Sequence, residues 1–261
     1  MMTDHAPREV EPAAPAEVAH GDGHLPPGGQ VTRGRRSLRR WAWAGLAAQA
    51  AFVASWGLAS NWQGPRYSTT AHSISDMYAE TAPHAAFLII VFTLCGAATI
   101  MFAARSVWRA LRPGGWTATV GSALLALSIV GLGDLLTPTE RLACRLADPG
   151  CTTAKQIANT GGMLDNTLST YGVVALVAAG LFLSFAMRRA ATWRGWAWPT
   201  RWTMVLLFLA AFADAIGQHY GLGGLFERLI ALIGAIWIGS LAVAILRRSR
   251  RARTGEVPAG R

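Results

Sequence analysis

Six stretches of the chain are apolar over the length of a membrane-spanning helix, and polar residues gather between them. A helix needs roughly 20 predominantly apolar residues to cross about 30 Å of hydrocarbon. The stretches lack the alternation of apolar and polar residues that is typical of barrel strands. We therefore predict an all-α integral membrane bundle of six transmembrane helices. The predicted spans cover residues 41–59, 85–104, 116–136, 168–187, 202–218 and 229–246.

The residues outside these stretches divide the chain into three regions. Residues 1–36 contain almost no large apolar side chains, so they cannot bury a core and are predicted to be a disordered cytoplasmic tail. Residues 37–250 form the predicted transmembrane domain, and residues 251–261 form a basic cytoplasmic tail. Of the 261 residues, 52% are hydrophobic and 15% are charged. Because soluble domains contain about 25% charged residues, this composition excludes an ordinary soluble protein.

The net charge is +10, and the basic residues are distributed unevenly. Of the 24 Lys and Arg residues, 19 lie in the two tails and in the loops after the second and fourth spans, all on one side of the membrane. The other side holds Arg66, Arg141, Arg145, Lys155 and Arg228. Since Lys and Arg are enriched on the cytoplasmic side, both termini are predicted to be cytoplasmic, in a multi-pass protein of the cell membrane. Juxtamembrane Arg clusters attract anionic lipids, so the lipid bilayer is the expected partner and nucleic acid is not.

The first outer loop carries polar side chains that fit either a structural or a binding role. Ser73 and Asp76 have the spacing of a capping box, in which the two side chains accept hydrogen bonds from free amides at a helix start. This spacing predicts a short helix over residues 74–82. The alternative is that the polar side chains of the loop belong to a binding site, and the candidates are Tyr67, His72, Ser75 and Asp76.

The outer loop between the third and fourth spans contains two cysteines. Cys144 and Cys151 flank Asp148-Pro149-Gly150, which is typical of a turn and would bring the thiols together. Since the outer face of a bacterial membrane is oxidising, the pair is a candidate disulfide. A zinc site would need two more ligands close by, and the sequence offers none. We therefore expect no metal and no other cofactor.

Polar and ionisable residues also fall near the outer ends of the predicted spans. At 1.5 Å per residue, Asp214 lies about 20 Å from the cytoplasmic end of its span. Ionisable residues at such depth are costly and are functional candidates by default. The candidates are Asp134, Asp214, Gln218, His219 and Arg228. The structural alternative is that Arg228 forms an ion pair with Asp214 or Asp134 that locks helices together.

Short motifs recur near the predicted spans. Pro65-Arg66-Tyr67-Ser68 precedes Ile74-Ser75-Asp76-Met77, Gly133-Asp134 precedes Pro138, and Gly223-Gly224-Leu225-Phe226-Glu227-Arg228 precedes Trp237. Over about residues 41–250 this arrangement resembles a prokaryotic multi-pass membrane family, domain of unknown function 998. The resemblance implies the multi-span fold and no particular activity, and it makes family positions of Ser75, Asp76, Asp134 and Arg228. Asp165 stands where members often have a histidine, so chemistry based on that histidine is not implied here.

Three functions fit these residues. We favour a polytopic protein with a polar pocket near the outer face that binds a small molecule or lipid headgroup, or assists a membrane complex, without catalysis. The second is a membrane-embedded hydrolase or transferase that uses outer-face His, Asp and Ser residues. Its metal version would use His72, His84 and His219, although no HExxH-type motif is present. The third is a proton-coupled transporter that uses Asp214, but six spans are few and no matching broken helices are evident in two halves.

Overall fold

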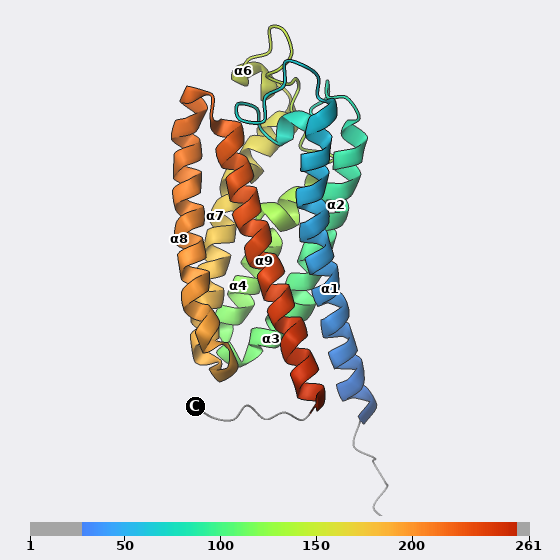
Figure 1. The fold of residues 1–261 in the computed structure, drawn as a ribbon, viewed down its shortest axis with the longest axis vertical. Coiled ribbons are helices and arrows are strands. Elements are labelled where there is room, and N and C mark those ends of the chain that lie inside the picture. Colours follow the sequence, from blue (N-terminus) through green and yellow to red (C-terminus); the bar gives the residue numbers. More distant parts are fainter. Residues whose placement is uncertain (1–27, 255–261) are drawn as a thin grey trace, which may run out of the picture.

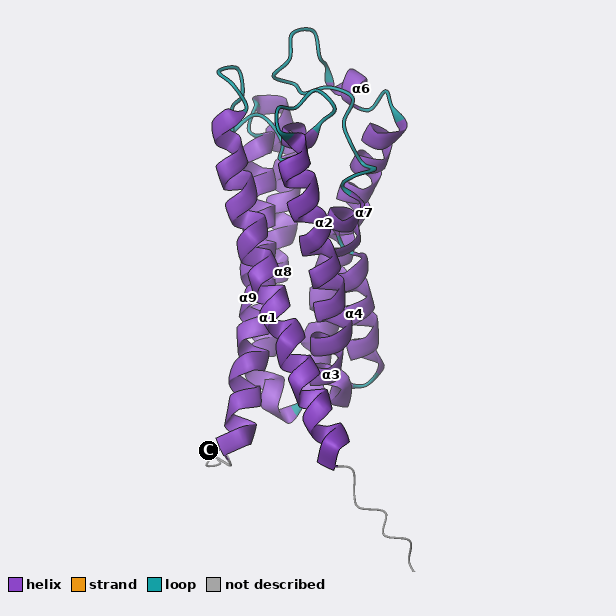
Figure 2. Ribbon diagram, turned by 90° about the vertical axis from the view of Figure 1, so that its right-hand side faces the viewer, coloured by secondary structure: helices purple, strands orange, loops and turns teal. Residues whose placement is uncertain are grey.

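The computed structural model describes residues 28–254, and every regular element in this range is a helix. The helices run side by side along one long axis (Figure 1, Figure 2). The start of α1 and the end of α9 lie at one end of the bundle, and the loops that carry α6 lie at the other. The α-helices are α1 (Gly28–Ala59), α2 (Ala85–Phe102), α3 (Trp108–Leu111), α4 (Trp116–Leu127), α5 (Asp134–Leu136), α6 (Thr153–Gln156), α7 (Thr160–Arg189), α8 (Arg194–Gly217) and α9 (Gly223–Thr254).

Five helical stretches in the described part of the chain are long and apolar enough to cross a membrane. They are Arg36–Trp62, Ala85–Gly114, Thr160–Arg189, Ala191–Tyr220 and Gly223–Arg250. A sixth is present if α4 and the segment Ile129–Leu136, which are bent by 43° at Ser128, count as one span. The protein is therefore an all-α, multi-pass membrane protein whose spans contact the lipid bilayer.

The long helices close into a bundle around an apolar core. α1 packs against α2 and α9, α8 packs against α9 and α7, and α7 packs against α4. Side chains of one continuous cluster, including Phe102, Leu125, Leu183, Leu207 and Ile238, are fully buried. Because these side chains are large and come from α2, α4, α7, α8 and α9, their van der Waals packing stabilises the whole bundle rather than one helix pair.

The expected third span over residues 116–136 is not one straight helix. Ser128 has an extended backbone with ψ 173°, and its hydroxyl donates a hydrogen bond to the Leu125 carbonyl at 2.8 Å. A π-helical turn over Ile129–Gly133 follows, and α5 begins at Asp134. A break at this depth is tolerated where the backbone is buried in protein or lines a cavity. The apolar pattern missed the break because Ser128 is small and no proline marks it.

Some predicted boundaries shift. α1 begins at Gly28, so the last part of the predicted tail is helical and the basic run before the first span lies on α1. α9 continues to Thr254, beyond the predicted domain end at residue 250. The remaining tail residues, 1–27 and 255–261, lie outside the described residues. The helix expected over residues 74–82 is shorter, a 3-10 turn η2 over Ser75–Tyr78.

Two loop segments, residues 63–84 and 137–159, cover the end of the bundle opposite the start of α1, and we call them the loop cap. A disulfide joins Cys144 to Cys151, and Arg145 forms a 2.6 Å ion pair with Asp148. Arg145 also donates to the Gln63 carbonyl at 3.0 Å, which ties the two segments together. The loop cap is therefore a connected structure that closes this end of the bundle.

Candidate functional site

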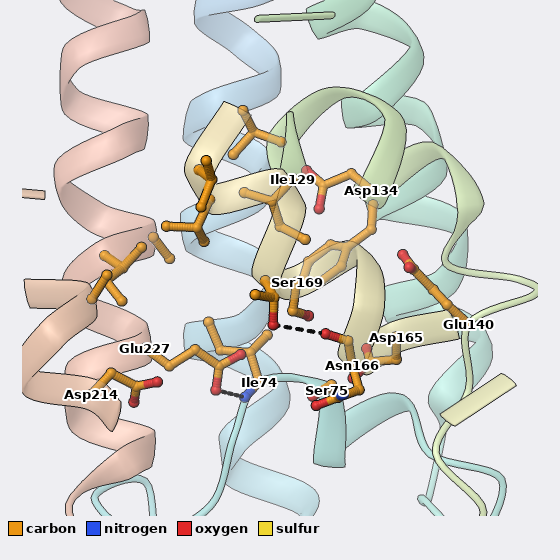
Figure 3. A pocket seen from close by; sticks show the side chains of 18 of the residues that line it. Ile74, Ser75, Ile129, Asp134, Glu140, Asp165, Asn166, Ser169, Asp214 and Glu227 are labelled. Carbon is orange, nitrogen blue, oxygen red and sulfur yellow. Dashed lines mark hydrogen bonds between the residues drawn. The ribbon is translucent and has the colours of Figure 1, made fainter. Parts of the chain in front are cut away.

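A cavity of about 470 Å³ lies between the helices beneath the loop cap (Figure 3). Its walls come from α1, α2, α7, α8, α9 and the broken span, and the loop cap contributes to it through η2 and Glu140. Phe52, Phe92 and Ile230 are among its apolar lining residues. This volume is in the range of cavities that hold small ligands.

Five carboxylic acids line the cavity, and each comes from a different segment. They are Asp134 of α5, Glu140 of the loop cap, Asp165 of α7, Asp214 of α8 and Glu227 of α9. The sequence has only eight acids between residues 28 and 254, so most of them meet here. Within that range, no Lys, Arg or His side chain lines the cavity. The cavity is therefore a site of concentrated acidic chemistry.

Three of the acids accept hydrogen bonds from neighbouring groups. The Tyr78 hydroxyl donates to Asp165 Oδ1 at 3.1 Å, and the Ile74 amide donates to Glu227 Oε2 at 2.8 Å. Asp214 Oδ2 accepts a hydrogen bond from Gln218 Nε2 at 3.2 Å. The first two bonds fasten the loop cap to α7 and α9, so part of the lining has a structural role.

The other two acids, Asp134 and Glu140, have no such partner. Their exposed fractions are 7% and 3%, and neither carboxyl accepts a hydrogen bond from any residue in the described range. Glu140 Oε2 is buried without a partner, as is the second carboxyl oxygen of Asp214, Oδ1. Figure 3 shows them on the side of the cavity opposite Asp214 and Glu227. A buried polar group without a partner costs free energy unless a ligand, proton or water satisfies it. These two carboxyls are thus the clearest sign of a binding site.

Glu140 provides a pH test of this arrangement. Burial, and then the charges of Asp165 and Asp134, raise the pKa of its carboxyl from 4.5 to about 9. Folding therefore takes up a proton between these two pH values, so the contribution of Glu140 to stability is complete below pH 4.5 and is lost as the pH rises through about 9. We expect the E140Q variant to lose less stability than wild type over this pH range in thermal unfolding experiments. E80Q, which changes an exposed acid of the same loop cap, is the control, and equal slopes for E140Q and wild type would contradict the prediction.

The structure separates the sequence-predicted residues into two groups. Ser75, Asp134, Asp214 and Gln218 line the cavity. The remaining candidates, Tyr67, His72, Asp76, His219 and Arg228, do not. His219 is exposed in the 3-10 turn η7 (Gln218–Tyr220) between α8 and α9. Of the residues predicted for the polar pocket, Asp134 and Asp214 therefore meet in this cavity, whereas Asp76 and Arg228 lie outside its lining.

The structural alternative, an ion pair between Arg228 and Asp214 or Asp134, is not what the structure contains. Nη1 of Arg228 donates to the carbonyls of Thr69, His72 and Gly224 at 2.7, 2.8 and 2.8 Å, and Nη2 donates to the Tyr67 hydroxyl. Arg228 forms no ion pair with any side chain that the structure describes. Arg228 therefore anchors the first loop to α9 through backbone carbonyls.

Asp76 is fully buried within the loop cap. Its Oδ1 accepts hydrogen bonds from Gln156 Nε2 at 2.6 Å and from the Leu146 amide at 3.2 Å. Ser73 Oγ accepts the Asp76 amide at 3.1 Å, so half of the predicted capping box forms. Burial raises the pKa of Asp76 to about 6, although its hydrogen bonds and Arg145 act in the opposite direction. Asp76 therefore connects the two segments of the loop cap.

The arrangement gives no support to a metal or serine-based catalytic centre. His72 Nδ1 accepts the backbone amide of Ser68 at 3.0 Å, and Ser73 Oγ is hydrogen-bonded to Ser75 Oγ at 3.0 Å, so neither serine is paired with the histidine. Across the described residues, no three His, Cys, Asp or Glu side chains are grouped closely enough to hold a metal ion.

A family model described as a protein of unknown function, DUF998, matches residues 46–244. The chain belongs to this family. Neither the curated proteins nor the solved structures include a significant match to the chain. The matched range contains all five acids of the cavity, so the cavity lies within the DUF998 domain.

Sequence reasoning missed several lining residues of this DUF998 protein. Glu140 and Asp165 lie outside the predicted spans, and Glu227 was part of a motif but had no assigned role. Asn166, Ser169 and Thr170 also line the cavity from the first turns of α7. The i, i+4 spacing of Asp165 and Ser169, and of Asn166 and Thr170, was a usable signal because residues four apart are neighbours on a helix surface.

Proposed function

We propose that this DUF998 protein crosses the cell membrane six times, with the broken span as one crossing and both termini in the cytoplasm. The placement of 19 of its 24 basic residues supports this orientation. The loop cap would then face the outside, where a disulfide is stable. A reporter that is active only in the cytoplasm should work when fused to either terminus. Activity at one terminus alone would contradict the topology.

We infer that the cavity beneath the loop cap binds a small molecule or a lipid headgroup. The observation that carries this inference is the pair Asp134 and Glu140, whose buried carboxyls line an open volume without a protein partner. A bound ligand that donates hydrogen bonds or carries positive charge would satisfy both groups. Because the acids come from five segments, ligand binding would also hold these segments together.

Filling the cavity tests this function. Ser169 lies on α7 and lines the cavity, so a tryptophan at this position would occupy ligand volume. We expect wild-type protein, extracted in nanodiscs with its native lipids, to retain a bound non-protein mass in native mass spectrometry, and S169W to lose it. The control is L206W, which places the same side chain on a 55% exposed position of α8 away from the cavity. The same bound mass in S169W and L206W would contradict the proposal.

The two alternative functions receive less support. A hydrolase or transferase needs an activated nucleophile or a metal, and the histidines and serines of the loop cap are not arranged for either. The break at Ser128 favours a transporter, since transporters bind substrates at broken helices. However, it is the single break among the spans between residues 28 and 254, whereas inverted repeats place a matching pair in two halves. A binding function needs only the cavity and its unpartnered acids.

A further inference from the structure

The charge of the lining restricts the class of ligand. Five acids and no described basic residue line the cavity. Five carboxyls that line one buried cavity cannot all ionise together, because like charges in a low-dielectric site repel one another. An anionic or phosphate-bearing ligand would add to this repulsion, whereas a cation would relieve it. Glu140 and Asp134, which have no protein partner, are placed to pair with that cation.

The position of the opening restricts the route of entry. Asn166, Thr170 and Val174 of α7 line the cavity and are exposed, as are Ala215 of α8 and Gln218, which directly follows α8. The cavity therefore opens sideways between α7 and α8, on the outside of the bundle.

The surface beside this opening is apolar. Tyr171 of α7 is 70% exposed and Phe212 of α8 is 61% exposed. Thr170 lies about 28 Å along the helix from Arg189 at the cytoplasmic end of α7, close to the outer edge of the hydrocarbon. At this depth the headgroups of the outer leaflet meet the acyl chains, so the opening faces the polar end of an inserted amphiphile.

We propose that the cavity binds an amphiphile with an amine or quaternary ammonium head, which enters sideways from the outer leaflet between α7 and α8. The inference rests on the binding function proposed above and specifies its ligand. The cationic head would lie against Asp134 and Glu140. The three hydrogen-bonded acids would line the rest of the cavity around it. The alkyl tail would leave along Val173 and Val174 towards the lipid. Binding of a quaternary ammonium head would release a proton from Glu140, whose pKa is raised to about 9 by burial and by the nearby acids.

Protection of a cysteine from labelling tests this proposal. The S169C variant is made in a C95A background, because Cys95 is the free cysteine among the described residues and Cys144 and Cys151 are bridged. The protein is placed in nanodiscs and labelled with N-ethylmaleimide, a small neutral reagent. The probes are dodecyltrimethylammonium, dodecyl sulfate and a neutral dodecyl ether at equal concentrations below micelle formation. We expect the ammonium probe alone to slow labelling.

Substitution of the unpartnered acids then tests whether the cavity is where the ammonium probe protects the S169C thiol from labelling. The D134N/E140Q double substitution keeps side-chain shape and removes the two charges, so it should weaken protection by roughly tenfold to a hundredfold. E80Q, which changes an exposed acid of the loop cap, should leave protection unchanged. If folded and unfolded S169C are labelled at the same rate, this position does not report on the cavity. The T170C variant then replaces it as the reporter of whether the ammonium probe slows labelling.

Each remaining result has a defined meaning. Equal protection by all three dodecyl probes would overturn the charge preference while leaving a binding cavity intact. Equal protection by tetramethylammonium, which has no tail, would show a soluble cation site and overturn lateral entry. No protection by any probe, with a bound mass still present in wild type and absent in S169W, would overturn the cationic amphiphile alone. No protection and no bound mass would remove both the ligand class and the binding function.

Discussion

The R228M variant should lose about 3–5 kcal/mol of folding stability. Arg228 is 8% exposed and donates to three backbone carbonyls and one hydroxyl. Methionine would retain most of the side-chain packing and provide none of these donors. The carbonyls of Thr69 and His72 would then lose a charged donor, and hydrogen bonds to charged groups contribute about 1.5–3 kcal/mol each.

The close packing around Arg228 leaves little room for the loop to shift towards another hydrogen-bond donor. A Cβ on Gly224, one turn earlier on α9, would lie 2.2 Å from the His72 carbonyl oxygen, so the loop rests directly on the helix. The Leu225 amide also donates to the Thr70 carbonyl at 2.9 Å. The loop therefore has no space to move towards a replacement donor, and the lost hydrogen bonds should remain unsatisfied.

Thermal unfolding and limited proteolysis measure this effect. R228M should unfold at a lower temperature and become susceptible to cleavage within residues 64–79, whereas R228K should show an intermediate loss because its ammonium has fewer donors. R66M is the matched control, since Arg66 lies on the same loop with an exposed side chain. If R228M is as stable and as resistant as R66M, Arg228 does not anchor the loop.

Arg228 also shows what the sequence was able to predict. Its depth in the last span correctly indicated a buried charge that needs partners. The protein partners considered for it were aspartates, as the alternative to a ligand site, because acidic side chains are visible in a sequence. Backbone carbonyls are present at every position and leave no pattern, so a loop that turns its carbonyls towards an arginine is recognised only in three dimensions.

The sequence predicted the spans better than it predicted the cavity, for a similar reason. Continuous apolar stretches predicted the long helices because membrane insertion depends on local hydrophobicity, which the sequence states directly. The acids of the cavity come from five segments, and the meeting of Glu140 with Asp134 and Asp165 depends on how the loop cap folds. Asp134 and Asp214 were found because each interrupts or ends an apolar stretch, whereas Glu140 lies in a polar loop where an acid is unremarkable.

The G96A variant should be destabilised because of a single added methyl group in α2. A Cβ at Gly96 would lie 2.3 Å from the Leu135 nitrogen and 2.6 Å from the Gly131 oxygen, both backbone atoms of the broken span. Backbone atoms cannot rotate away as a side chain can, so α2 and the broken span must separate. Overpacking of this kind costs about 1–3 kcal/mol, in addition to any loss of cavity shape around Asp134.

The matched control is G57A in α1, where an added Cβ meets no atom within 4 Å. Alanine is a better helix former than glycine by about 0.5–1 kcal/mol, so G57A should be neutral or slightly stabilising in thermal unfolding. G96A should lower the unfolding temperature and also change the labelling rate of S169C, since the broken span forms one wall of the cavity. If G96A behaves as G57A does in both measurements, the close contact between α2 and the broken span is not what holds Asp134 at the cavity.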